Sequence, residues 1–429
     1  MISSTFLAMA IFLVIAVPIS VVIAIISFVP YIMDPTFPAS PMFILRQIVS
    51  GLDSTTLLAI PMFVLSGIIM ARGGISKKLF NIFAYFIGDK TGGMPCAVVI
   101  TCLFYGAISG SAPATTAAVG AMTIPLLVSL GYNIVFCAAL VAISGGLGVI
   151  IPPSVPFIMY SMGSGASVGD LFTAGIVPGI LIGACIMIYA VYYCKKHGED
   201  KEKIKASVDE LRKNGFMKVF MDSFWALLSP IIILGGIYSG AVTPTEAAVI
   251  SVVYALVICL FIYKTLKISE LYQVLREAVA TFAPILFILG AANAFSRVLT
   301  LTQAPQILAE FMGDNISNKI ILLILINIFL LFVGMVMDTG PAILILTPIF
   351  VPIITAVGID PVHFGVILIV NLAIGFVTPP LGNNLFVAST MTKVPVMSIA
   401  KKVVPFMGAF AVALILITFI PQISLLFIK

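Results

Sequence analysis

The sequence predicts an all-α polytopic membrane protein built from two inverted repeats, each with a re-entrant helical hairpin and a discontinuous helix. Three observations predict this class. Of the 429 residues, 61% are hydrophobic and only 9% are charged, whereas charged residues make up about 25% of an ordinary soluble domain. The two halves of the chain repeat the same order of glycines and prolines. Each half also interrupts a long apolar stretch with residues that break helices.

The composition excludes a water-soluble fold, because so little charge cannot cover so much apolar surface. The lipid bilayer must act as the solvent, which favours membrane-spanning helices. An outer-membrane barrel is excluded because its strands alternate apolar and polar residues, whereas this chain runs continuously apolar. The six cysteines have no metal-ligand spacing, so we interpret them as small packing residues.

The internal repeat pairs residues 109–161 with residues 337–388, at an offset of 227 or 228 residues. Repeats of this kind, with helix breakers at matched positions, are typical of secondary transporters. The matched positions are Pro113 with Pro341, Pro125 with Pro352, Gly131 with Gly358, Gly148 with Gly375, and Pro152-Pro153 with Pro379-Pro380.

Three parts follow from the repeat: a first inverted repeat over residues 1–194, a charged cytoplasmic linker over 195–218, and a second inverted repeat over 219–429. Each repeat is expected to contain two opening spans, a third span, a short amphipathic arm, an interrupted stretch, a broken span and a last span. In the first repeat these are residues 4–17, 19–33, 54–71, 78–88, 97–130, 134–165 and 171–193. In the second they are residues 222–239, 245–263, 279–296, 303–313, 320–357, 362–390 and 403–427.

The first of these segments is predicted to be a permanent span. No Lys or Arg precedes Arg46, and a cleaved signal peptide needs a positive region before its apolar core. Residues 4–17 therefore do not fit a signal peptide.

The interrupted stretches 97–130 and 320–357 are predicted to be re-entrant hairpins, the first entering from the inner face and the second from the outer face. Each is long enough for two short helices and carries a turn sequence in its middle, SGSAP in the first and DTGP in the second. Glycine permits unusual backbone dihedrals, and proline readily starts a new helix. A hairpin that returns to its own side leaves five crossings in each half, so the second half must be inverted.

The distribution of positive charge orients the chain. With the N-terminus outside and the linker inside, eighteen of the 22 Lys and Arg residues lie on the inner face. Cytoplasmic loops of helical membrane proteins carry an excess of Lys and Arg. Both termini are therefore predicted to be periplasmic. The outer face then holds only Arg46, Arg297, Lys319 and Lys429.

Four separated segments resemble one family, the large membrane subunit (DctM-like) of tripartite ATP-independent periplasmic (TRAP) transporters. The resemblance covers essentially the whole chain, and the four segments are GAISGSAPATTAAVG, GVIIPPSVPFIMY, GGIYSGAVTPTEAAV and GFVTPPLGNNLFV. It implies a sodium-driven carrier of the elevator type in the bacterial inner membrane, with a scaffold and a moving transport domain.

The resemblance also implies partners and a substrate class. A small four-helix membrane subunit and a periplasmic substrate-binding protein accompany the large subunit in this family. Substrates of such systems are organic acids, including sialic acid and C4-dicarboxylates. Because the chain begins directly at the first large-subunit span, a separate small subunit is expected. Sodium ions are the expected coupling ions, and no other cofactor is expected.

The candidate site lies at the two hairpin tips and the broken spans that face them. Proline has no N–H and removes the bond to the carbonyl one turn earlier, so freed carbonyls there can bind a cation. Half-helix N-termini can bind a carboxylate. The candidate sodium-binding residues are Ser109, Ser111, Gly145, Gly148, Ile151, Asp338, Thr339, Gly340, Gly375 and Thr378. The candidate substrate-binding residues are Ser111, Ser154, Asp338, Asn383 and Asn384, of which the two asparagines resemble substrate-side positions of the family.

Each candidate also has a purely structural interpretation. Ser109 and Ser111 suit close helix packing, and freed carbonyls can be satisfied by water or by side-chain hydroxyls. Asp338 is the only acid deep in an apolar stretch, where an ionisable residue usually marks a functional site. Its alternative role is the N-cap of the helix that starts near Pro341.

Two other functions compete with the tripartite transporter. An autonomous sodium/carboxylate symporter of related fold would need no binding protein, and the residues themselves do not exclude it. An integral-membrane enzyme that modifies lipids would need an acid cluster or a nucleophile–base pair. No His stands beside a candidate nucleophile and no G-x-x-x-x-G-K-[ST] motif occurs, so we assign no catalytic residue and no ATP-driven step.

The orientation can be tested by thiol labelling. A cysteine in place of Ser207, in the linker, should not react with a membrane-impermeant reagent added to the periplasmic side of intact cells, because the linker is expected inside. The same cysteine should react once the cells are permeabilised, with the parent chain as the background. Ready labelling in intact cells would refute the orientation.

Overall fold

The structure is a computed structural model that describes residues 2–15, 17–213, 215–304, 307 and 318–428. Within these residues the secondary structure is helical, with no β-strand. Nine helices in the described part of the chain are long and apolar enough to cross a membrane. The predicted class of multi-pass helical membrane protein is therefore confirmed.

The first half follows the expected order with one additional helix. α4 (Pro41–Ser50) lies where the sequence indicated no element, and Ser40 caps it by accepting the Phe43 N–H. The other helices of this half are α1 (Ile2–Val14), α2 (Ile19–Ile26), α3 (Val29–Met33), η1 (Thr55–Leu58), α5 (Ala59–Arg72), α6 (Ile75–Ile87), α7 (Gly93–Ser109), α8 (Ala112–Ser129), α9 (Ile134–Gly145), η2 (Gly146–Val149), α10 (Val155–Ser164) and α11 (Val168–His197).

The second half repeats that order with longer opening helices. Its first two have 23 and 14 residues, against 13 and 8 in the first half. The arm expected at 303–313 falls largely outside the described residues. After the linker helix α12 (Lys201–Lys213), the helices are α13 (Phe216–Tyr238), α14 (Pro244–Val257), η3 (Ile258–Ile262), η4 (Ile268–Glu270), α15 (Leu271–Leu301), α17 (Lys319–Val336), α18 (Thr339–Ala356), α19 (Pro361–Gly375), α20 (Asn383–Thr392), α21 (Val396–Phe419) and α22 (Gln422–Leu425).

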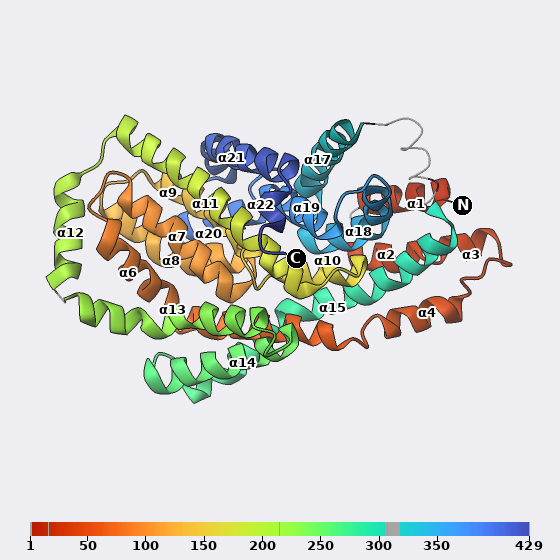
Figure 1. Cartoon of the computed structure of the whole chain (residues 1–429), viewed down its shortest axis with the longest axis horizontal. Helices are drawn as coiled ribbons and strands as arrows, with labels where there is room; N and C mark the ends of the chain where they lie inside the picture. The colour runs from red at the N-terminus through yellow and green to blue at the C-terminus, as the bar shows by residue number, and fades with distance from the viewer. Residues whose placement is uncertain (1, 16, 214, 305–306, 308–317, 429) are drawn as a thin grey trace.

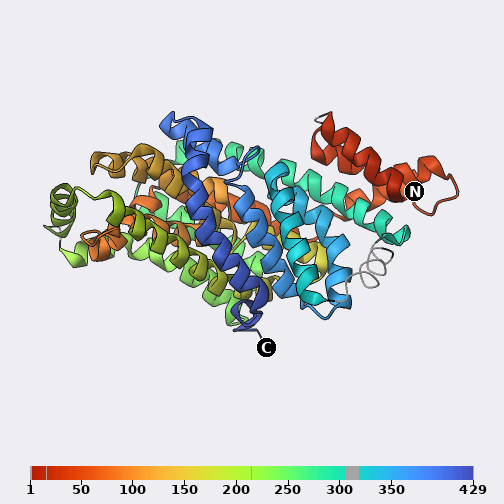
Figure 2. The same cartoon turned by 90° about the horizontal axis from the view of Figure 1, so that it is seen from above.

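The helices pack in two groups. In the first group α15 contacts α2, α4 and α5, and α14 contacts α5 and α13. Figure 1 shows α4, α13, α14 and α15 along one long edge of the molecule. The second group contains α7 to α11 and α17 to α22. In Figure 2 the red N-terminal helices lie at one end, while the blue C-terminal helices cross the middle. α6 contacts both α7 and α13, so it bridges the two groups.

The linker helix α12 lies against α6, at the end of the molecule far from the N-terminus (Figure 1). Its apolar residues Ile204 and Val208 are buried. Arg212 donates a hydrogen bond to the Tyr85 carbonyl at 2.9 Å and pairs with Asp89 at 2.9 Å. This guanidinium holds the pKa of the Asp89 carboxyl below its ordinary value. α12 is therefore attached to α6 by both apolar and charged contacts.

The segment just before α12 is attached to the ends of other helices. Both carboxylate oxygens of Glu199 accept the Gly92 N–H, at 3.1 and 3.0 Å. Glu199 also accepts the Tyr132 hydroxyl. Gly92 directly precedes α7, and Tyr132 lies between α8 and α9. The Glu199 carboxylate therefore connects the linker, by hydrogen bonds, to the start of the first hairpin and to the segment just before the first broken span.

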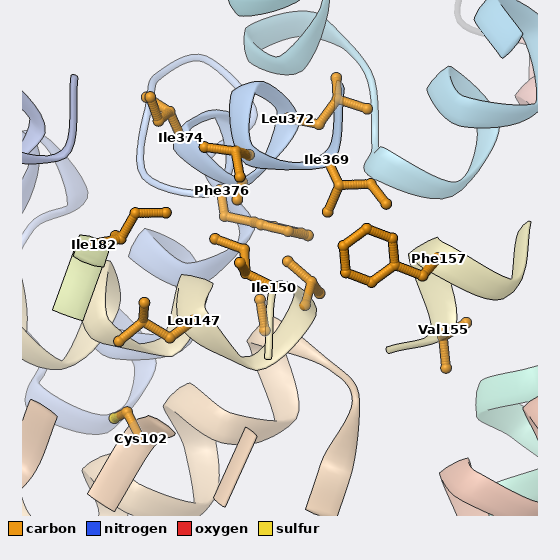
Figure 3. Close-up of a cluster of buried hydrophobic side chains, with 14 of the residues drawn as sticks. Cys102, Leu147, Ile150, Val155, Phe157, Ile182, Ile369, Leu372, Ile374 and Phe376 are labelled. Atoms are coloured by element: carbon orange, nitrogen blue, oxygen red, sulfur yellow. The ribbon is translucent and has the colours of Figure 1, made fainter. Parts of the chain in front are cut away.

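An apolar cluster fills the interior where the two broken spans meet. Leu147 and Ile150 come from the first break, and Ile374 and Phe376 come from the second. Figure 3 shows these side chains in one cluster together with Ile182 of α11, and all five are buried. Because both halves contribute to this cluster, the two breaks are held at fixed relative positions.

Candidate functional site

The tip of the first hairpin lies between α7 and α8. Gly110 has a φ of +60°, in the left-handed region that glycine adopts readily. The Ser109 hydroxyl lies 2.8 Å from the Thr115 hydroxyl, which donates to the Ser111 carbonyl at 2.9 Å. Ser109 and Thr115 are buried. The tip therefore gathers two hydroxyls and a carbonyl oxygen in a small buried volume.

The first broken span packs directly on this tip. A Cβ atom added to Gly148 would lie 2.8 Å from the Ser111 carbonyl oxygen and would overlap the Thr115 hydroxyl. A Cβ atom added to Gly145 would overlap the Thr116 hydroxyl. Both glycines are thus required for contact between the hairpin and the break, and the predicted residues Ser109, Ser111, Gly145 and Gly148 come together.

Asp338 lies at the tip of the second hairpin, between α17 and α18. Its carboxylate accepts the Thr339 N–H at 2.9 Å and the Asn383 side-chain amide at 3.1 Å. The first bond makes Asp338 the N-cap of α18, as its structural interpretation expected. The second bond links the same carboxylate to the first residue of α20. Asp338 is therefore both a cap and a connection between the tip and the second break.

The second broken span also packs on its hairpin. A Cβ atom added to Gly375, the last residue of α19, would overlap the Gly334 carbonyl of α17 and lie 2.7 Å from the Gly334 Cα. The Thr378 hydroxyl donates to the Ile374 carbonyl at 2.8 Å, and the Asn384 N–H donates to the Phe376 carbonyl at 2.9 Å. The Asn384 bond satisfies the Phe376 carbonyl, which Pro380 leaves without a helical partner, whereas the Thr378 hydroxyl adds a second bond to the Ile374 carbonyl, which already accepts the Val377 N–H.

Each hairpin also accepts one backbone hydrogen bond from the residues that follow the Pro-Pro pair in its own half. Val155 donates to the Gly110 carbonyl at the first tip, at 3.4 Å, and Leu381 donates to the Met335 carbonyl in the last turn of α17, at 3.2 Å. Buried backbone donors need partners. The two bonds supply them and connect each hairpin to its break.

Matched glycines make a close approach between helices in each half. A Cβ atom on Gly106 would lie 2.7 Å from the Gly148 Cα, which parallels the Gly375–Gly334 contact. Gly334 follows Gly106 by 228 residues, and Gly375 follows Gly148 by 227. The same offset therefore relates both the sequence motifs and the contacts that they make.

Three predicted residues are arranged differently from the others. Ser154 is fully buried, and its hydroxyl donates to the Val149 carbonyl at 2.6 Å and caps α10 by accepting the Phe157 N–H. The side chain of Ile151 packs against Gly179 of α11, which leaves only its backbone for a site. Gly340 faces α10, where a Cβ atom would lie 3.3 Å from the Met159 Cε.

Asn384 connects the second break to the first half. Its side-chain amide donates to the Ala142 carbonyl of α9 at 2.9 Å, and its Oδ1 has no hydrogen-bond partner among the described residues. The buried atoms Ser144 Oγ and Asn371 Oδ1 also lack one within that part of the chain. Ser144 and Asn371 are 227 residues apart, so they occupy matched positions in the repeat.

Sequence reasoning missed the polar residues that support the site from neighbouring helices. Thr115 and Thr116 follow the first tip, and Asn327 of α17 accepts the Asn371 side-chain amide at 2.8 Å. Asn327 could have been noticed in the sequence because it is a lone amide in an otherwise apolar span. Its partner was not visible in the sequence, because 44 residues separate the two asparagines.

The arrangement offers oxygen donors. Among the described residues no cluster of three or more His, Cys, Asp or Glu side chains occurs. The two tips instead bring together hydroxyl and carbonyl oxygens, with one carboxylate at Asp338. Such hard oxygens suit small hard cations.

The family model described as "Tripartite ATP-independent periplasmic transporter, DctM component" matches residues 6–423 of this chain. The chain belongs to this family. The resemblance noted in the four sequence segments is therefore confirmed, and the proteins most similar to the chain include transporter permeases rather than enzymes.

Three relatives show the range of the family. The chain is 41% identical over 373 residues to the C4-dicarboxylate TRAP transporter large permease protein DctM of Pseudomonas aeruginosa, covering 86% of this chain and 85% of that one. It is 36% identical to the sialic acid large permease SiaM of Vibrio cholerae, covering 90% and 88%. It is 40% identical to the isethionate permease DctMQ of Oleidesulfovibrio alaskensis, where it covers 97% of this chain but spans 65% of that protein.

Two solved structures share the fold at low identity. The Neisseria gonorrhoeae MtrF structure matches with a TM-score of 0.59 and 14% identity, covering 88% of this chain and 83% of that chain. The Alcanivorax borkumensis YdaH transporter matches with a TM-score of 0.54 and 14% identity, covering 88% and 87%. The fold of this chain therefore also occurs in proteins that share only 14% of its sequence.

The glycine contact between α17 and α19 can be tested directly. Gly375→Ala should lower stability by about 1–3 kcal/mol, because overpacking against a fixed backbone cannot be relieved by a side-chain rotation. Thermal unfolding of the purified protein in detergent measures the change. Gly408→Ala in α21 is the matched control, since its Cβ atom would meet nothing within 4 Å. Equal stability of the two variants would show that the contact is not tight.

Proposed function

We propose that this chain is the large membrane subunit of a sodium-driven TRAP transporter that imports an organic acid into the cell. The observation that carries the proposal is that each hairpin accepts a backbone hydrogen bond from the residues after the Pro-Pro pair of its own half. The names of the three relatives support the substrate class, because C4-dicarboxylates, sialic acid and isethionate are all carboxylates or sulfonates.

One sodium site in each half is part of the proposal. In the first half, the Ser109 and Thr115 hydroxyls and the Ser111 carbonyl lie within hydrogen-bond distance of one another and face Gly148. These donors fit a small hard cation. Gly145 and the backbone of Ile151 complete the proposed set of sodium ligands in the first half. A bound ion supplies an electrostatic link between the tip and the break.

The second sodium site is proposed around Asp338 and the start of α18. Its further residues are Thr339, Gly340, Gly375 and Thr378. Because a carboxylate offsets part of the charge of the cation, this site differs from the first in charge although its position in the repeat is matched. The two sites would therefore bind sodium with different strength.

The substrate is proposed to lie between the tips. The Ser111 hydroxyl and the Asn383 and Asn384 amides are the donors for its acidic group. Asp338 holds the Asn383 amide at 3.1 Å, so it orients that donor and does not meet the anion directly. Ser154 acts as the cap that positions α10, because its hydroxyl is already committed to the Val149 carbonyl.

An elevator movement is proposed for the two packed groups. The group containing α5, α13, α14 and α15 would be the scaffold, and the group containing both hairpins would be the transport domain. α6, which contacts both groups, would act as the arm. The orientation proposed is a periplasmic N-terminus and a cytoplasmic linker in the inner membrane. The proposed partners are a small four-helix membrane subunit and a periplasmic substrate-binding protein.

The proposal predicts the requirements for uptake. Liposomes that contain this chain with the small subunit should take up a radiolabelled organic acid only when the loaded binding protein and an inward sodium gradient are both present, and ATP should be unnecessary. The acids tested should be succinate, sialic acid and isethionate. Uptake without the binding protein would favour an autonomous symporter, and undiminished uptake in potassium-only buffer would contradict sodium coupling.

The role of Asp338 is tested by Asp338→Asn. This change keeps the shape and the capping ability of the side chain but removes its charge. Uptake or apparent sodium affinity should fall by about tenfold or more, the equivalent of at least ~1.4 kcal/mol, while folding and assembly with the small subunit remain unchanged. Measuring uptake against sodium concentration provides the number.

The matched control is Asp360→Asn. Asp360 is also an N-cap, accepting the Val362 and His363 N–H groups of α19, but it lies at the exposed start of that helix. It should leave the sodium dependence unaltered. If both variants behave alike, Asp338 is only a helix cap and the second sodium site must be abandoned.

A further inference from the structure

A cavity of about 390 Å³ lies away from the hairpin tips, between the two packed groups of helices. One wall comes from α15 and from the segment that joins α4 to η1, and the other comes from the end of α10 and the middle of α18. Its volume falls within the range of ~300–1,000 Å³ typical of small-molecule sites. The cavity therefore has the size of a ligand site and lies where the groups would move past each other.

The lining of the cavity is uncharged and combines hydroxyl and amide groups with apolar side chains. None of its lining residues is Asp, Glu, Lys or Arg. The Asn293 amide is already used, since it donates to the Gln47 carbonyl at 2.7 Å, and the Ser161 hydroxyl donates to the Ala166 carbonyl. The side-chain hydroxyls that make no hydrogen bond to the described residues, and are therefore free to bind a ligand, are those of Ser50, Ser54, Thr56 and Ser296.

The helices α10 and α18 connect this cavity to the candidate site. Gly340 faces Met159, and Gly163 faces Thr347, so the two helices run side by side in the same direction. Leu344 and Pro348 line the cavity. They lie four and eight residues beyond Gly340, or about 6 and 12 Å along a helix that rises ~1.5 Å per residue. The cavity therefore begins about one helical turn beyond Gly340 on α18.

We propose that this cavity is an outer subsite on the transport route, where an organic anion is held by neutral hydrogen-bond donors before it reaches the hairpin tips. This inference rests on the proposed function and adds a second place of contact for the substrate. A carboxylate or sulfonate accepts hydrogen bonds from hydroxyls without forming an ion pair. Passage requires binding that is favourable enough for arrival and weak enough for departure, and an uncharged lining meets both conditions.

Thiol labelling tests whether the cavity admits an organic anion. Ser296→Cys places a thiol in the lining, and Thr300→Cys places one a turn further along α15, at an exposed position outside the cavity. The purified full chain is treated with 2-sulfonatoethyl methanethiosulfonate, which is itself a small organic sulfonate, and with its trimethylammonioethyl analogue. Both faces of the protein are accessible in detergent, so the result does not depend on orientation.

The cysteine at 296 should react with the sulfonate reagent, and its ratio of anionic to cationic reaction rates should equal or exceed the ratio at 300. No reaction at 296 while 300 reacts would overturn the proposal. A ratio several-fold lower at 296 would overturn it as well, because the cavity would then exclude anions. The parent chain, whose native cysteines are buried except for the half-buried Cys185, provides the background.

Uptake measurements test the same cavity in the working transporter. Ser296→Asp and Ser296→Asn are similar in size, but only the aspartate is charged. Since like charges in close contact repel strongly, uptake of the organic acid should fall about tenfold or more for the aspartate variant relative to the asparagine variant. The pair Thr300→Asp and Thr300→Asn should show no such difference. Equal uptake by the two 296 variants would overturn the proposal.

The two proposals fail in distinguishable ways. If the parent system takes up none of the three acids with binding protein and sodium present, the proposed function fails, and the labelling result still decides whether the cavity admits an organic sulfonate. If the parent transports but the cysteine at 296 excludes the sulfonate reagent, or the two 296 variants take up the acid equally, the subsite fails while the transport function stands.

Discussion

Backbone polar groups that lie within a bilayer must find partners inside the protein, and this constraint governs the rest of the structure. Each Pro-Pro pair removes helical hydrogen bonds from the middle of a span. The hairpins provide part of the compensation, through the bonds from Val155 to Gly110 and from Leu381 to Met335. The Ser154 hydroxyl provides more of it at the Val149 carbonyl, and the Asn384 N–H does so at the Phe376 carbonyl. A broken span and its hairpin are therefore one structural unit.

The same constraint explains why the candidate site is made mostly of glycines and small polar residues. A tip can only reach a break if no side chain intervenes, so Gly148 and Gly375 lie at the points of contact. Hydroxyl groups such as those of Ser109 and Thr115 are short enough to remain in the space that is left. The result is a region with many backbone oxygens and few bulky side chains. A site for a small hard cation needs the same arrangement.

Much of this architecture follows from local signals in the sequence. The helix ends at Ser109 and Gly375 could be predicted because glycine and proline act within a turn of their own position. The helix α4 was missed, although Ser40 followed by proline is a start signal for a helix. The Asn327–Asn371 pair and the capping role of Ser154 could not be predicted, since both depend on which groups meet after folding. The two turns that interrupt residues 97–130 and 320–357 were placed correctly in the sequence, while the re-entrant course of these segments and the assignment of sodium and substrate to them remain predictions.

The attachments of the linker bear on how the protein is assembled in the cell. Every partner described for Glu199 and Arg212, namely Tyr85, Asp89, Gly92 and Tyr132, precedes the linker in the chain. During synthesis these groups are already available when the linker leaves the ribosome. The linker can therefore close over this end of the first half before the second half is translated. In this order of events the first half provides a finished surface against which the later helices insert.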